Sequence, residues 1–364
     1  MALNDDTLLA EVPITGRQLA LPPGPIFHLH RAAQSDHEIG EFRAWAGYKT
    51  LGVDEATAGL AHFQHVVSFA GTQAAGRTGV HAHLAQVHIV IPTSGRGVFS
   101  YDGVTTEAVP GVVIHQHGGT IHDQFDYSYA AASDAENRLT PQSLEPPPPG
   151  APPRSFGFLE LFIPQTFANV EIVPPTEVTP GDQRSAWDHP YHAAGASFSL
   201  QAPGDPEAAY RPVSGRPDLE ARDGGTWESS GRLAATWIVR PATPAPGAAG
   251  AAGVVDLTPA GEAGGLVILY MVAGSASVTG PGGAPVRLQA GDCLTVSQDL
   301  AGDPMEPSAD MSLLKVFISS RAQALRERTP EEIARLEALG PAIITRRELR
   351  PQGDARPVNV LHGG

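Results

Sequence analysis

Short runs of β-branched and aromatic residues, separated by glycine-containing turns, fill residues 60–130 of this 364-residue chain. The runs read HFQHVVSFAG, GVHAHLAQVHIVIPTSGRG, VFSYDGVTTEAVPG and VVIHQHGGTIHDQF. Strands this short at such close spacing are typical of a β-barrel or a β-sandwich. We therefore expect a mainly all-β fold rather than one built on helices.

The second half of the chain repeats this succession of strand, turn and strand, in ATWIVRPA, GLVILYMVAGSASVTGPGG and APVRLQAGDCLTVSQ. When Gly95 is aligned with Gly274, Gly111 meets Gly291 with one residue inserted. This alignment predicts an internal duplication. The length agrees, because 364 residues are too many for one ordinary domain and suffice for two.

The pattern divides the chain into five parts. They are an N-terminal extension (1–45), a first barrel (46–180), a connection (181–230), a second barrel (231–320) and a C-terminal helix and tail (321–364). The proline-rich segment 140–154 is interpreted as a surface excursion of the first barrel or as a lid. The C-terminal helix is predicted to begin at Thr329, with Pro330 in its first turn and Glu332 completing a capping box, and to end at Gly340.

The charge balance excludes several classes of partner. Lysine and arginine total 24 and aspartate and glutamate 39, which gives a net charge of −15. Such a chain repels nucleic acid and anionic membranes, so neither partner is expected. The single cysteine cannot form an internal disulfide, and no apolar run approaches the roughly 18 residues of a membrane helix. The N-terminus lacks the features of a signal peptide, and a cytoplasmic location is expected.

Histidine is concentrated in the first predicted barrel, where eight of the 14 histidines lie within 61 residues. His81 and His83 are separated by one residue, so in a strand their side chains lie on the same face. Their two imidazoles can then bind one metal ion. His88 follows a short turn, and His122 follows a second turn. We predict that His81, His83, His88 and His122 bind one divalent metal ion.

Three further residues are candidates for a substrate pocket. In HFQHVVSF, Phe63 and His65 share a strand face and would line the pocket if that face is interior. The opposite parity would turn His62 inward instead. His117, close to the last predicted ligand in the sequence, is the third candidate. No catalytic residue beyond the ligands is assigned.

These motifs resemble those of the cupin superfamily. In the first motif His81 and His83 are the histidine pair, His88 stands where an acidic residue is usual, and Gly95 follows after six residues. In the second motif Gly111, Gly119 and His122 match, while His117 replaces the usual proline. The resemblance implies a bicupin with two jelly-roll barrels (double-stranded β-helices) and a metal site in the N-terminal barrel. It also implies a homodimer.

The second predicted barrel keeps no ligand set. The positions that align with the four histidines are Ala260, Glu262, Val267 and Gly302. If the duplication holds, this barrel is a metal-free copy that serves packing, oligomerisation or closure of the pocket.

The ligand set directs the functional prediction. Imidazole ligands suit Fe, for which the resemblance gives the preference, and also Zn, Ni, Mn, Co or Cu. Without a carboxylate the site keeps a formal charge of +2, which favours a small anionic substrate. Four ligands leave two positions of an octahedral ion open. We therefore predict a non-haem dioxygenase, an oxidoreductase acting on a small enolic, diketone or hydroxy-aromatic molecule.

Two alternatives remain open at this point. A non-redox lyase, isomerase or cyclase would use the metal as a Lewis acid. A metal-stabilised binding bicupin without catalysis would hold a saturated tetrahedral ion.

Overall fold

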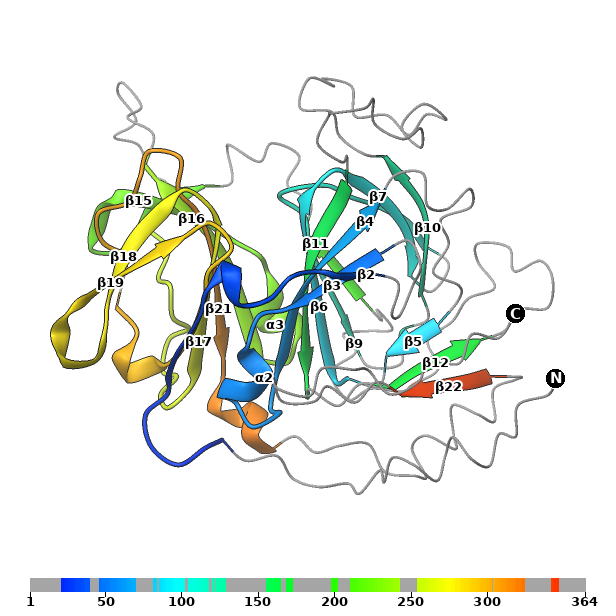
Figure 1. Ribbon diagram of the computed structural model, residues 1–364, viewed down its shortest axis with the longest axis horizontal. Coiled ribbons are helices and arrows are strands. Elements are labelled where there is room, and N and C mark those ends of the chain that lie inside the picture. Colours follow the sequence, from blue (N-terminus) through cyan, green and yellow to red (C-terminus); the bar gives the residue numbers. More distant parts are fainter. Residues whose placement is uncertain are drawn as a thin grey trace.

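The computed structural model describes residues 21–39, 46–69, 81–83, 85–101, 104–117, 120, 122–128, 155–164, 168–172, 198–201, 210–242, 254–302, 304–324 and 342–346. These residues form two β-sheet units that lie side by side (Figure 1). Every strand pair within the sheets is antiparallel. The predicted all-β class is confirmed.

The first unit contains two facing sheets. The larger has the order β13 (Phe198–Gln201), β9 (Val113–His117), β6 (Val87–Ser94), β11 (Ser155–Ile163), β4 (His62–Phe69), β3 (Ala46–Thr50) and β2 (Glu38–Ile39). The smaller has the order β22 (Ala342–Arg346), β12 (Ala168–Ile172), β5 (His81–His83), β10 (His122–Ser128), β7 (Arg96–Tyr101) and β8 (Val104–Ala108).

The second unit has a seven-stranded sheet and a hairpin. The sheet has the order β1 (Phe27–His30), β20 (Cys293–Ser297), β17 (Leu266–Ala273), β21 (Ser312–Ile318), β16 (Ala234–Pro241), β15 (Arg216–Asp223) and β14 (Arg211–Val213). The hairpin pairs β18 (Ser275–Thr279) with β19 (Pro285–Gln289). The described helices are short: α2 (Val53–Ala56), α3 (Thr226–Ser229), and the 3₁₀ turns η1 (Ala32–Gln34), η4 (Pro281–Gly283), η5 (Gln298–Leu300) and η6 (Ser320–Ala324).

The two seven-stranded sheets share one strand order, as an internal duplication requires. Strand β6 occupies the position of β17, β11 that of β21, and β4 that of β16. The aligned turn glycines Gly95 and Gly274 have φ angles of 70° and 66°, a left-handed conformation that favours glycine. The edge strands differ in their place in the sequence. Strand β13 comes after the other strands of its sheet, whereas its counterpart β1 comes before the other strands of the second unit's sheet. The N-terminal segment therefore contributes β1 to the second unit and β2 to the first.

The larger sheet of the first unit is buried on both faces. On β6, Ile89 and Ile91 belong to a core shared with Ile268 and Leu314 of the second unit. Val90, on the opposite face, packs inside the first unit. A third core fills the second unit between its sheet and the hairpin. The alternation of side chains along β6 thus provides two different cores.

Several predictions from the sequence concern residues outside the described ranges. The helix expected from Thr329 to Gly340 and the proline-rich segment 140–154 both lie there. The five sequence ranges remain predictions, although strands β1, β13, β14 and β15 fall in the predicted extension and connection and join the sheets of the two units. Among the described residues, no helix combines the length and apolar character needed to cross a membrane.

The shared core makes the two units depend on each other. Leu161 of β11 is fully buried in that core. We expect Leu161→Ala to lower the free energy of unfolding by about 2–5 kcal/mol, because the neighbouring sheets cannot collapse into the space it leaves. Urea unfolding measures the change. Leu300→Ala, at a site 38% exposed, is the matched control and should change stability by only about 0.5 kcal/mol. Equal effects of the two substitutions would contradict this packing.

Candidate metal centre

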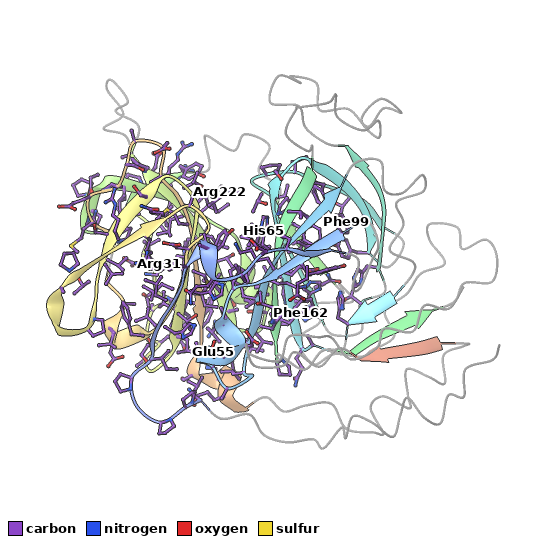
Figure 2. All side chains as sticks on the ribbon, in the orientation of Figure 1. Arg31, Glu55, His65, Phe99, Phe162 and Arg222 are labelled. Carbon is purple, nitrogen blue, oxygen red and sulfur yellow. The ribbon has the colours of Figure 1, made fainter. Side chains whose placement is uncertain are left out.

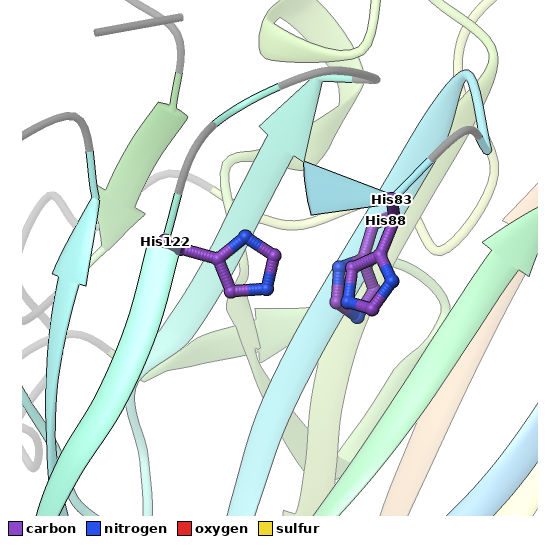
Figure 3. A group of neighbouring side chains, drawn as sticks. All are labelled: His83, His88 and His122. Atoms are coloured by element: carbon purple, nitrogen blue, oxygen red, sulfur yellow. The ribbon is translucent and has the colours of Figure 1, made fainter. Parts of the chain in front are cut away.

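Three buried histidines converge between the two sheets of the first unit. His83 comes from β5 and His122 from β10 of the smaller sheet, and His88 comes from β6 of the larger sheet. Each offers a ring nitrogen, and these nitrogens all lie within 4.8 Å of one another. Figure 3 shows the His122 ring facing those of His83 and His88. This group could hold a metal ion, since imidazole nitrogens bind most divalent transition metals.

Hydrogen bonds orient two of the rings, and that of His122 suits metal binding. Nδ1 of His122 lies 3.0 Å from the carbonyl oxygen of Thr120, which can only accept, so this nitrogen carries the proton. In the neutral ring Nε2 then keeps its lone pair for a metal. For His88, Nε2 of Gln116 lies 2.6 Å from Nδ1 and donates to it, so the neutral ring carries its proton on Nε2. A metal at Nε2 requires the Gln116 amide to turn, so that its oxygen accepts from Nδ1 instead. His88 Nε2 has no hydrogen-bond partner among the described residues.

A carboxylate that sequence analysis missed lies beside this nitrogen. Oε1 of Glu160, on β11, is 3.4 Å from Nε2 of His88. Two atoms that each bind one ion at about 2.1 Å lie about 3.0–3.4 Å apart, so this separation fits two ligands of one metal. The sequence analysis expected no carboxylate beside the histidines, whereas Glu160 lies beside His88. Glu160 is the lone charged residue of the strand SFGFLELFI, and this was the available signal.

A chain of side chains on β4 holds Glu160 in place. Nε2 of Gln64 donates to Oε2 of Glu160 over 2.6 Å, and Oε1 of Gln64 lies 3.1 Å from Nε2 of His62. Because Gln64 donates with its nitrogen, its oxygen accepts, and His62 Nε2 must carry the proton. One carboxylate oxygen is thereby fixed, and the other faces His88.

Aromatic rings enclose the polar group. Phe162 stacks on His88 with 4.3 Å between ring centroids, and Tyr101 stacks on His122 at 5.6 Å. Burial, with a smaller contribution from the charge of His122, lowers the pKa of His88 well below its usual value. Burial and then the charge of Glu160 raise the pKa of Tyr101 well above its usual value. His88 is therefore a neutral imidazole and Tyr101 a neutral phenol at physiological pH.

The structure brings together three of the four predicted ligands, His83, His88 and His122. His81 also lies on β5, where its backbone pairs with that of His122. Its side chain is outside the described part of the chain, so its role as a ligand stays a prediction.

Two of the predicted pocket residues lie on the other face of β4. Phe63 belongs to the core between the units, and His65 contacts His37 and Thr93 at 3.2 Å each. The alternative parity is observed, with His62 and Gln64 on the side of the histidine group. Phe63 and His65 occur together on the outer face because a strand alternates its side chains and that face packs on the second unit. His117 is buried on β9 with its ring 4.7 Å from that of His115.

No protein-family model and no curated protein sequence matches this chain. Similar solved structures include a vicilin from Solanum melongena, with 13% identity, a TM-score of 0.47 and coverage of 80% of this chain and 85% of that one. Procruciferin, an 11S globulin from Brassica napus, has 8% identity, a TM-score of 0.46 and coverage of 84% and 86%. Oxalate decarboxylase from Bacillus subtilis has 11% identity, a TM-score of 0.41 and coverage of 80% and 76%. At these values the likeness carries no argument about function.

The histidine group predicts a defined metal stoichiometry. We expect the protein to bind one divalent transition-metal ion, and His88→Gln to weaken binding by about tenfold or more, because a ligand nitrogen is lost. Calorimetric titration with Co²⁺ and Zn²⁺, followed by metal analysis after dialysis, measures this. His28→Gln, on β1 of the second unit, is the matched control. Unchanged affinity in His88→Gln would rule out this ligand.

The burial of His65 predicts that the free energy of unfolding depends on pH. Its burial, with the positive potentials of His37 and Lys49, lowers its pKa to about 3. Between about pH 6.5 and pH 3 the unfolded chain binds a proton here that the native protein does not, so stability falls as the pH falls. Its share of the loss between pH 7 and pH 5 is about 2 kcal/mol.

Urea unfolding with a chelator present, at pH 7 and pH 5, measures this share as the difference between wild type and His65→Gln. The glutamine amide stays neutral at both pH values and can still bond Thr93. If the variant loses as much stability as wild type, His65 does not contribute.

Proposed function

We propose that the protein is a metal-dependent enzyme whose ion is held by His83, His88, His122 and Glu160. The observation that carries this proposal is the convergence of three buried imidazole nitrogens with a carboxylate oxygen 3.4 Å from one of them. Imidazole nitrogens that present lone pairs to one buried space attract a cation, which offsets the repulsion between them. The motif resemblance to bicupins supports His83, His88 and His122, and it adds His81 as a further ligand.

The carboxylate changes the charge of the proposed site. Three neutral imidazoles leave a divalent ion at a formal +2, and Glu160 lowers this to +1. A net positive charge remains inside a protein of net charge −15, and it favours an anionic substrate. Enolates, phenolates and carboxylates fit this preference.

The surrounding residues have separate roles in this proposal. Thr120 and Gln116 fix the orientations of His122 and His88. Gln64 holds one oxygen of Glu160 so that the other stays directed at the ion. Phe162 excludes water from one side of His88, and Tyr101 keeps its phenolic proton. Such partners of the ligands tune affinity and geometry.

We propose that the reaction is oxidation of a small enolic, diketone or hydroxy-aromatic substrate by dioxygen. A bound iron ion would supply the redox chemistry, which a zinc ion cannot. The alternative is a non-redox lyase or isomerase reaction. In that reaction the ion would act as a Lewis acid.

Oxygen uptake distinguishes the two reactions. We expect iron-loaded protein to consume dioxygen with a β-diketone or a dihydroxybenzoate, and zinc-loaded protein to consume none. Turnover of the same substrates by both forms under anaerobic conditions would instead indicate the non-redox reaction. If neither the iron-loaded nor the zinc-loaded protein converts any of these substrates, with or without dioxygen, the proposal that the protein is an enzyme acting on them is contradicted.

Glu160→Gln tests the proposed carboxylate ligand. We expect about tenfold or more weaker metal binding, because the amide carries no charge and is a poorer ligand than the carboxylate. Glu262→Gln is the matched control, because Glu262 is a nearly buried carboxylate bonded to Ser319 and Arg321 of the second unit. Equal metal affinity in wild type and Glu160→Gln would remove Glu160 from the ligand set.

A further inference from the structure

A cavity lies between the two units, outside the histidine group. It has a volume of about 240 Å³. One wall comes from the end of β6, at Ile91 and Thr93, and from the turn that contains Gly111. The opposite wall comes from the second unit, and its apolar part includes Ile238 and Val272. The cavity is smaller than sites for drug-sized ligands, so it suits a small molecule.

Arg222 is the charged residue of this cavity. It belongs to β15, whose residues Leu219 and Ala221 point into the core of the second unit. Arg222 takes the other face, toward the first unit, and Figure 2 shows it where the two units meet. A Cβ atom placed on Gly111 would lie 3.8 Å from Nη2 of Arg222. The guanidinium therefore reaches across the cavity toward the wall formed by the first unit.

The guanidinium is buried without a counter-charge among the described residues. Arg222 is 3% exposed, and its Nη2 has no hydrogen-bond partner in the described part of the chain. Its one polar interaction seen there is with the side chain of Tyr210. Arg240, on the neighbouring strand, instead pairs with Glu220 at 2.6 Å. Burying an unpaired cation is unfavourable, so an anion is the expected partner of Arg222.

We propose that this cavity binds a small monocarboxylate with an apolar body. The carboxylate would accept a hydrogen bond from Nη2 of Arg222, since guanidinium and carboxylate match in charge and geometry. Thr93 and Ser312 supply further polar atoms to the lining, and the remaining walls are largely apolar. Such walls favour an aliphatic or aromatic body and disfavour a strongly hydrated ion such as phosphate.

This site is separate from the proposed metal centre. His88 faces the interior of the first unit, whereas Ile91 faces the second unit from the opposite side of β6. A ligand in the cavity would therefore contact the strand that carries His88 without entering the histidine group. The inference does not depend on any reaction proposed for that group.

Calorimetric titration of the full-length protein with hexanoate and benzoate tests the proposal. We expect one molecule to bind per chain, and Arg222→Met to weaken binding by about tenfold or more, because the charged hydrogen bond is lost. The neutral hexanamide and benzamide should bind wild type about tenfold more weakly, for the same reason. Binding should persist in His88→Gln, which separates this cavity from the metal centre.

Two further variants make the test decisive. Arg216→Met, on the same strand but paired with Asp218 outside the cavity, should bind as wild type does. Val272→Phe, which fills the apolar side and leaves Arg222 in place, should lose binding even if Arg222→Met fails to fold. The proposal is overturned if no carboxylate binds below about 10 mM. It is equally overturned if the amides or inorganic phosphate bind as tightly as the carboxylates, or if folded Arg222→Met keeps wild-type affinity.

Discussion

The alternation of side chains across one sheet determines most of this structure. The seven-stranded sheet of the first unit is covered on one face by its partner sheet and on the other by the second unit. Ile89 and Leu161 therefore serve the core between the units, while their sequence neighbours His88 and Glu160 point into the first unit. A slip of one residue in either strand would exchange these roles, so the shared core also fixes the register of the polar group.

The polar side chains inside the first unit can be buried because they form hydrogen bonds with one another and with the backbone. Gln64 and Gln116 bond Glu160 and His88, and a backbone carbonyl orients His122. Each bond removes part of the penalty of burying a polar atom. What remains is three imidazole nitrogens within 4.8 Å of one another, a group that could hold a metal ion.

The duplicated second unit has a role although it carries no comparable group among its described residues. Its seven-stranded sheet covers the outer face of the first and shares a hydrophobic core with β6 and β11. The same contact leaves a cavity where Arg222 meets the end of β6. The second unit thus covers one candidate site and contributes most of the lining of another.

Local pattern was sufficient for part of this description. The runs of β-branched residues and the recurring glycines predicted a duplicated β fold, and the spacing of the histidines predicted that His83, His88 and His122 would meet. These features lie within short segments or recur in the sequence, so they can be recognised without knowing how distant segments pair. Tertiary structure alone decided that Glu160 lies beside His88, that Phe63 and His65 face the second unit, and that β1 leaves its sequence neighbours to complete the other sheet. Each of these depends on which face of the sheet a strand turns inward and on which distant strands pair. Neither can be read from the spacing of residues in a single sequence.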